Sequence, residues 1–126
     1  MSTKLKENLQ IKPAFAMREA LQFWHDVVVK SLQNKHAYDL SARQTAILLS
    51  IYTSSSAHTI KSLAEDLVIS KPAICRAIDA LSIIGLVKRK RDSKDKRIIY
   101  LQRTVKGSVF LSEFAETIKT SLAKHI

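Results

Sequence analysis

Basic side chains gather in one short stretch of the sequence, VKRKRDSKDKRIIYL, residues 87–101. Seven lysines and arginines lie between Lys88 and Arg97, and four strand-forming residues, Ile98 to Leu101, follow at once. Fixed cations at this density attract phosphates and other polyanions. A solvated basic tail would not continue into β-branched and aromatic residues. The stretch therefore predicts a folded hairpin with a basic tip.

The excess positive charge is concentrated in the middle of the chain. The 126 residues include 21 Lys and Arg against 11 Asp and Glu, a formal net charge of +10. Residues 41–104 hold twelve of the basic and five of the acidic side chains, whereas the two ends are nearly balanced. A field confined to one segment favours a nucleic-acid partner over a generally basic protein, and it argues against a module that binds other proteins.

No group of residues has the spacing of an enzyme active site. The sequence has no catalytic triad and no paired-carboxylate motif, and two glycines are too few for a phosphate-binding loop. The single cysteine excludes an intrachain disulfide, and because the chain has no resolving cysteine an inert Cys75 is favoured over a redox sensor. We therefore expect a protein that is not an enzyme and has neither metal nor cofactor, since metal-ligand spacing is absent from the four histidines, His25, His36, His58 and His125.

Nothing in the sequence predicts export or membrane insertion. No apolar stretch is long enough to span a bilayer, and the N-terminal residues MSTKLKENLQ lack an apolar signal core. We expect a cytoplasmic protein.

Helix caps and apolar periodicity predict five helices around the hairpin. Pro13 suits the first turn of a helix that runs to about residue 33. Ser41, Thr59, Ser70 and Thr104 are the expected N-caps of the other four, and Gly85 is expected to end the fourth. Residues 53–58 read as a loop, and the hairpin is expected to have strands at 86–91 and 97–102 around a tip at 92–96.

The third and fourth helices form a helix-turn-helix unit, whose second helix enters the major groove of DNA. On its first turns the sequence predicts five readers of the duplex, Ser70, Lys71, Ala73, Cys75 and Arg76, with the last able to pair with guanine. A helix-turn-helix followed by a basic hairpin is the winged-helix order. Two alternatives stay open: a module for RNA or single strands, which would need exposed aromatic residues, and a protein-interaction winged helix.

Residues 40–107 resemble the MarR family of bacterial transcriptional regulators. The resemblance is carried by TIKSLAEDL, the R-x-I-D-x-L-x-x-x-G-L-V pattern at 76–87, the D-x-R of Asp95 to Arg97, and Thr104-x-x-Gly107. It implies that Arg97 enters the minor groove and that Asp95 braces it. The family often has Ser or Thr where this chain has Ala73 and Cys75, and usually has leucine where this chain has Arg103.

The resemblance also implies a homodimer held by the first and last helices, on a pseudo-palindromic operator. The expected dimerisation residues are Met17, Leu21, Trp24, Val28, Phe110, Phe114, Ile118 and Leu122. Trp24 and His25 could line a pocket for an unknown small-molecule effector, although such residues are more often packing residues.

The sequence therefore predicts one domain over residues 1–126, mainly α with a small β-hairpin wing. A winged helix-turn-helix at 41–104 is flanked by dimerisation helices at 13–33 and 105–126. Its expected partner is double-stranded DNA in the bacterial nucleoid, where it would regulate transcription. The predicted wing contacts are Lys88, Arg89, Lys94, Asp95, Lys96 and Arg97.

Overall fold

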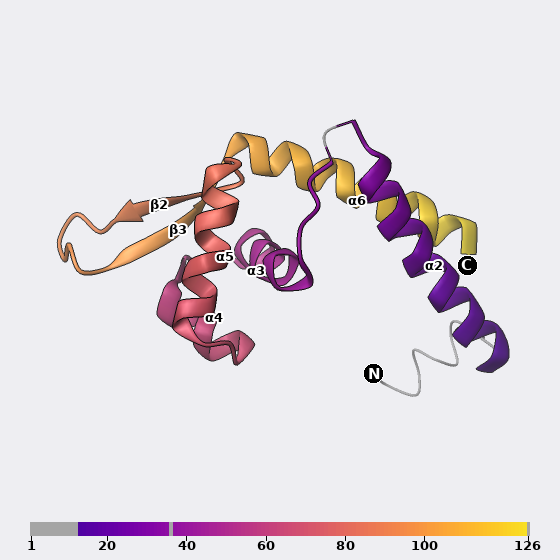
Figure 1. Ribbon diagram of the computed structural model, residues 1–126, viewed down its shortest axis with the longest axis horizontal. Coiled ribbons are helices and arrows are strands. Elements are labelled where there is room, and N and C mark those ends of the chain that lie inside the picture. The colour runs from indigo at the N-terminus through magenta and orange to yellow at the C-terminus, as the bar shows by residue number, and fades with distance from the viewer. Residues whose placement is uncertain (1–12, 36, 126) are drawn as a thin grey trace. The chain divides into compact units, whose positions relative to one another are not determined.

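The computed structural model describes residues 13–35 and 37–125 (Figure 1). The N-terminal residues MSTKLKENLQ and His36 lie outside these residues. The elements confirm a mainly α chain with a small sheet, in the order α2 (Pro13–Gln33), α3 (Ala42–Thr53), β1 (His58–Thr59), α4 (Ile60–Leu67), α5 (Lys71–Ile83), β2 (Val87–Arg91), β3 (Ile99–Arg103) and α6 (Val105–His125). Within the described ranges, no helix is both long and apolar enough to cross a membrane.

The chain forms two compact units. Among the described residues, the central unit comprises residues 39–113, and the terminal unit combines residues 13–35, 37 and 38 with residues 114–125. α6 therefore contributes its first turns to the central unit and its last turns to the terminal unit.

The predicted caps begin the helices of the central unit. Ser41 and Thr59 each accept a hydrogen bond from the backbone N–H three residues later, and both caps form complete capping boxes. The Ser70 side chain accepts the N–H of Ala73 at the start of α5. Gly85 follows the end of α5 with φ +78°, a left-handed conformation that glycine adopts without a steric penalty.

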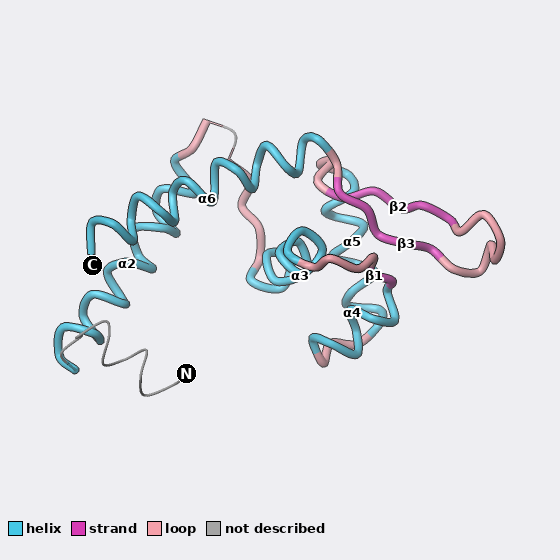
Figure 2. Tube along the Cα trace, turned by 180° about the vertical axis from the view of Figure 1, so that it is seen from behind, coloured by secondary structure: helices cyan, strands magenta, loops and turns pink. Residues whose placement is uncertain are grey.

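The sheet has three antiparallel strands in the order β1-β3-β2, one more than the predicted hairpin (Figure 2). β1 is a correction to the loop expected at residues 53–58, because His58 pairs with Leu101 across the sheet. The second hairpin strand begins at Ile99 and not at residue 97, because the Ile98 N–H donates to Asp95 O within the tip. It extends to Arg103, which pairs with Val87.

One tyrosine joins the ends of three elements at the base of the hairpin. The Tyr52 hydroxyl, from α3, donates to Leu86 O at 2.7 Å and accepts the Thr104 N–H at 2.9 Å. Thr104 Oγ1 in turn donates to Gly85 O and accepts the Gly107 N–H, at 2.7 and 2.9 Å. The Thr104-x-x-Gly107 motif therefore caps α6 and ties it to the residues that connect α5 with β2.

The apolar core of the central unit lies beneath α5. The fully buried side chains come from α3, α4, α5 and the first residues of the hairpin, and they are Ile47, Leu48, Leu63, Ile74, Ile78, Leu81, Leu86 and Val87. Burial of each such side chain contributes about 1.5–3 kcal/mol. These contacts fix α5 and the base of the hairpin on one scaffold.

The terminal unit packs α2 against the last turns of α6. Val27 of α2 and Ser121 of α6 are buried, at 0% and 1% exposure. His125 near the end of α6 lies between two carboxylates of α2, with its ring nitrogens 2.8 Å from Glu19 Oε2 and 2.8 Å from Asp26 Oδ2.

Val68, in the turn between α4 and α5, has a strained backbone. Its φ of 55° and ψ of 48° are left-handed, and its side chain is 90% exposed. A left-handed L-residue costs about 1–2 kcal/mol, and β-branching adds to the strain without a burial contribution to offset it. We expect Val68→Gly to raise the free energy of unfolding by about 1 kcal/mol in urea titrations.

The matched control for Val68→Gly is Val109→Gly, at an exposed valine inside α6. There the same substitution should lower the free energy of unfolding by about 0.5–1 kcal/mol, because glycine is a poor helix former. Equal signs for the two substitutions would contradict the strain at Val68.

Candidate nucleic-acid interface

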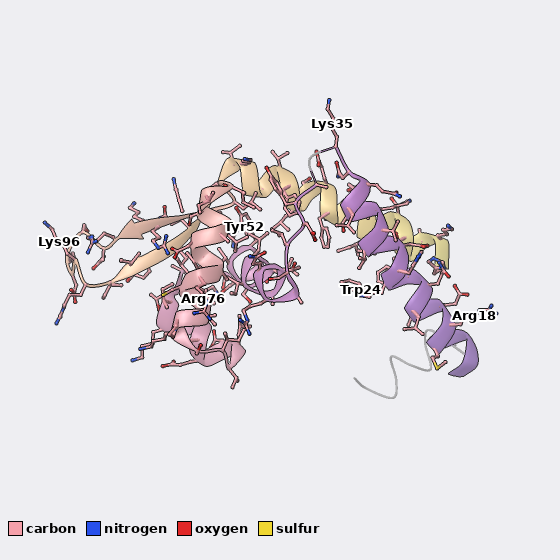
Figure 3. All side chains as sticks on the ribbon, viewed as in Figure 1. Arg18, Trp24, Lys35, Tyr52, Arg76 and Lys96 are labelled. Carbon is pink, nitrogen blue, oxygen red and sulfur yellow. The ribbon has the colours of Figure 1, made fainter. Side chains whose placement is uncertain are left out.

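The first turns of α5 present some, but not all, of the predicted reading residues. Lys71 and Arg76 are exposed, Cys75 is partly exposed, and Ser70 stands exposed at the cap. Figure 3 shows Arg76 projecting from α5. The start of this helix offers few backbone N–H groups to a phosphate, because Pro72 has none and those of Ala73 and Ile74 already donate to Ser70.

The predicted exposure of Ala73 is wrong. Its side chain is 5% exposed, because Ala73 begins the buried stripe that continues through Ile74, Ala77 and Ile78. A buried methyl group cannot reach a base edge, so Ala73 belongs to the packing of α5 and not to its reading face.

The hairpin is held beside α5 by an ion pair between their side chains. Arg89 of β2 donates to Asp79 Oδ1 of α5, and Val87 and Leu101 are buried at the base of the hairpin. An ion pair therefore joins α5 to the basic hairpin, and Lys96 lies at the far end of the hairpin (Figure 3).

The arginines of the hairpin are all engaged within the protein. Besides the pair with Asp79, Arg91 donates to Lys96 O and closes the tip. Arg97 donates twice to Asp95, from Nε to Oδ1 and from Nη2 to Oδ2, both at 3.1 Å. The hydrogen bonds from Arg97 lower the pKa of the Asp95 carboxyl and raise the pKa of Arg97. The brace implied by the D-x-R motif is therefore confirmed, and it leaves the Arg97 side chain 90% exposed.

Arg103 was not among the predicted functional residues, although it holds the sheet to α3. Its guanidinium donates to Ile51 O at 3.3 Å and to Ser54 O at 2.6 Å, and it lies 5.8 Å from the centre of the Tyr52 ring. It thus satisfies carbonyls at the C-terminal end of α3, where a cation is favourable. The sequence feature that could have indicated this role is that Arg103 stands where the family that the chain resembles usually has leucine.

The lysines, by contrast, carry the free charge of the hairpin. Within the described part of the chain, no side-chain hydrogen bond or ion pair involves Lys88, Lys90, Lys94 or Lys96, and all four are exposed. Successive strand residues point to opposite faces, so Lys88 lies on the face opposite Arg89. The predicted wing contacts therefore lie on two faces and a tip.

The predicted dimerisation residues of α2 form an exposed apolar stripe. Met17, Leu21, Trp24 and Val28 are 70%, 65%, 57% and 38% exposed. On α6, Leu122 is 43% exposed, while Phe110, Phe114 and Ile118 are half-buried. Residues 13–35 and 37–125 contain no group of three His, Cys, Asp or Glu side chains arranged to hold a metal ion.

Comparisons with known proteins give one family model and a set of solved structures with the same fold. The model of the MarR family matches residues 40–99. No curated protein matched the sequence. Solved structures resemble the chain at low identity, so they bear on the fold alone.

The first similar structure is the crystal structure of the YusO protein from Bacillus subtilis, with a TM-score of 0.70, 19% identity, and coverage of 100% of this chain and 84% of that one. FabT from Streptococcus pneumoniae, in complex with DNA, has a TM-score of 0.66 and 20% identity over 86% of this chain and 78% of that one. A cysteine-to-serine mutant of MarR from E. coli, complexed with operator DNA, has a TM-score of 0.63 and 19% identity over 97% and 79%.

The matched residues 40–99 contain α3, β1, α4, α5 and β2, together with the tip and the first residue of β3. Those are the elements that carry Arg76, the Asp79–Arg89 pair and the free lysines. The MarR family model therefore matches the residues that form these elements, and the chain has the winged helix-turn-helix fold of the solved structures that it resembles.

Proposed function

We propose that this protein is a transcriptional regulator that binds double-stranded DNA in the bacterial cytoplasm. The observation that carries the proposal is that Arg76 is exposed on α5 and that the Asp79–Arg89 ion pair joins the cationic hairpin to the same helix. An α-helix fits the major groove, and a basic hairpin fits the adjacent backbone and minor groove. The DNA-bound structures of MarR and FabT, which share the fold, support the same partner.

Two parts of the binding surface, α5 and the tip of the hairpin, have different functions. Arg76 reads a base edge, with Ser70, Lys71 and Cys75 beside it on the first turns of α5. Lys94 and Lys96 at the tip, together with Arg97, attract the backbone and the minor groove without regard to sequence.

The protein binds DNA as a homodimer in this proposal. Four exposed apolar residues on one face of α2 are unfavourable in water, and a second copy of the chain would cover them. Two-fold symmetry then requires two similar half-sites about one helical turn apart. Sedimentation equilibrium gives the assembly state directly.

The deciding experiment is selection of bound sequences from random duplex DNA. It returns the motif, its symmetry and the half-site spacing together. A parallel gel-shift series with duplex DNA, single-stranded DNA and RNA tests the alternative partner. Preference for single strands would overturn the proposal, and an absence of aromatic residues from Ser70 to Arg76 argues against that outcome.

Arg76→Ala should remove discrimination at one base pair of the selected site, at a cost of about 1–3 kcal/mol, because a guanidinium pairs with a guanine edge in two places. Binding to unrelated duplexes should change little. The measurement compares affinities for the selected site and for its variants at that position.

Lys94→Ala is the matched comparison for Arg76→Ala. It should weaken binding to every duplex alike and lower the salt dependence of log K by about one for each protomer, because each phosphate contact releases one counterion. If both substitutions had the same effect on all duplexes, the two functions assigned to α5 and to the tip would not be separate.

A further inference from the structure

We propose that assembly of the homodimer is controlled by pH: two copies of the chain associate through α2 while His125 is an imidazolium, and they separate as that proton is lost. The controlling contact joins α2 to the last turns of α6, where His125 lies between Glu19 and Asp26. The inference rests on the homodimer of the proposed function and adds a means of regulating it.

The terminal unit has almost no core of its own. Figure 1 and Figure 2 both show α2 alongside the last turns of α6, yet Val27 and Ser121 are the only described side chains of this unit that are buried. The Ser121 hydroxyl has no hydrogen-bond partner among the described residues, so its burial is unfavourable. Two helices with so little buried apolar surface are not stable as a separate unit. The order of this unit therefore depends on contacts beyond its core.

Two opposite faces of α2 supply those contacts. Glu19 and Asp26, seven positions apart, lie on the face that meets His125. In a helix with about 3.6 residues per turn, the opposite face carries the exposed apolar stripe, which is 38% to 70% exposed at Met17, Leu21, Trp24 and Val28. In the dimer, α2 therefore lies between α6 and the second copy. Each contact holds the helix in place for the other, so the two contacts stabilise each other.

His125 can bond to both carboxylates only in its protonated form. Its Nδ1 lies 2.8 Å from Glu19 Oε2, and its Nε2 lies 2.8 Å from Asp26 Oδ2. A neutral imidazole has one N–H, so its other nitrogen would direct a lone pair at a carboxylate oxygen. Since the His125 side chain is 10% exposed, water compensates poorly for this repulsion. Loss of the proton therefore weakens the contact between α2 and α6, and with it the dimer.

The other charged and titratable groups around the bridge act on Asp26. From α2, His25 lies 3.0 Å from Asp26 Oδ1, and from α6, the Lys124 ammonium lies 3.9 Å from Asp26 Oδ2. Among the described residues, Glu19 has no hydrogen bond or ion pair except the one with His125. Deprotonation of His125 would therefore leave one of the two carboxylates without its donor.

General repulsion between the copies predicts the opposite dependence on pH. The chain has a formal net charge of +10 with its histidines neutral, so two copies repel each other. Loss of protons lowers this repulsion and would strengthen the dimer. A dimer that weakens as the pH rises therefore requires a specific protonated contact. Because a dimer engages two half-sites and a single copy engages one, affinity for the operator should fall with the dimer.

Sedimentation equilibrium of the full chain, at constant ionic strength, measures the dissociation constant of the dimer from about pH 6 to about pH 8.5. For the wild type this constant should rise at least about tenfold over the range, because separation of the copies releases the proton of each His125. His125→Gln should give a constant that does not depend on pH, since glutamine does not titrate.

Glu19→Gln separates the proton from the contact. Its amide oxygen can accept from an imidazolium, and its amide nitrogen can donate to a neutral imidazole. The variant should remain dimeric at about pH 8.5, with a dissociation constant that changes less than about threefold over the range. Affinity for the selected duplex, measured on the same samples, should fall with pH for the wild type and stay level for Glu19→Gln.

The matched control is Glu116→Gln, at an exposed carboxylate of α6 in the same unit that pairs with Lys119, and it should keep the wild-type rise. A wild-type constant that does not rise with pH, or a rise that persists in His125→Gln or Glu19→Gln, would overturn the inference and leave the homodimer standing. A wild type that is monomeric over the whole range would overturn both. A rise that is lost in His25→Gln but kept in His125→Gln would assign the proton to His25.

Discussion

Gly107→Ala should destabilise the central unit by about 3–5 kcal/mol, the largest effect that we expect from a change of one methyl group. A Cβ at this position would lie 1.8 Å from the Tyr52 hydroxyl oxygen and 2.5 Å from Leu86 O. The backbone carbonyl cannot retreat, since it belongs to the connection between α5 and β2. Tyr52 must therefore move.

Displacement of Tyr52 removes more than van der Waals contact. Its hydroxyl is the partner of both Leu86 O and the Thr104 N–H, so two backbone groups at the base of the wing would lose their hydrogen bonds. Each buried group left unsatisfied costs about 1–3 kcal/mol. DNA affinity should fall along with stability, because these bonds hold the hairpin at its base.

Urea titration followed by circular dichroism measures the effect of Gly107→Ala. Ser108→Ala is the control on the neighbouring exposed residue, and it should change the free energy of unfolding by less than about 0.5 kcal/mol. Tyr52→Phe in the Gly107→Ala background should recover part of the loss, because it removes the atom nearest the added methyl group. Additive costs for the two substitutions would contradict the clash.

Local rules were sufficient to predict the helices and their order. Ser41, Thr59, Ser70 and Thr104 each cap the helix expected of them, and Gly85 ends α5, because caps and left-handed termini depend on residues three or four positions apart. Arg76 was correctly placed on the exposed face of α5 for the same reason. The predicted face of α5 was wrong at Ala73, because the buried stripe also includes Ala73, one residue before Ile74.

Interactions between distant residues could not be predicted in this way. β1 has two residues and exists only through its pairing with β3, about forty positions later. Arg103 contacts Ser54, and His125 contacts Glu19 at a separation of 106 residues. The hydrogen-bond partners of the hairpin arginines likewise decide which cationic side chains remain available to a ligand. Composition cannot show this, because it counts lysine and arginine as equal charges.

The His125 bridge gives the terminal unit a stability that should fall as the pH rises above neutral. Both ring nitrogens lie 2.8 Å from carboxylate oxygens, so each must carry a proton to donate, and the ring is an imidazolium. The hydrogen bond to Asp26, and to a smaller extent the hydrogen bond to Glu19, raise the pKa of His125 above its ordinary 6.5. Lys124, 3.9 Å from Asp26, and His25, 3.0 Å from it, are the other charged or titratable groups that face the bridge.

The direction of the pH effect follows from that shift. A group whose folded pKa is raised binds its proton more tightly in the folded state, so its contribution is complete below pH 6.5 and is lost as the pH rises through the higher folded value. The acid side of the dependence of stability on pH comes from Asp26, whose pKa is lowered mainly by its hydrogen bond with His125. Its contribution is present above its ordinary 3.8 and is lost in acid.

Trp24, the only tryptophan, lies on α2 and reports on the terminal unit through its fluorescence (Figure 3). The urea midpoint from this signal should decline from pH 6.5 into the mildly alkaline range for the wild type. His125→Gln should start lower and remain flat, because glutamine can bond to one carboxylate but does not titrate. His25→Gln, at an imidazole whose side chain is 64% exposed, should keep the wild-type decline. If His125→Gln declined in parallel with the wild type, another group would carry the pH dependence, and the imidazolium would not be what holds α6 to α2.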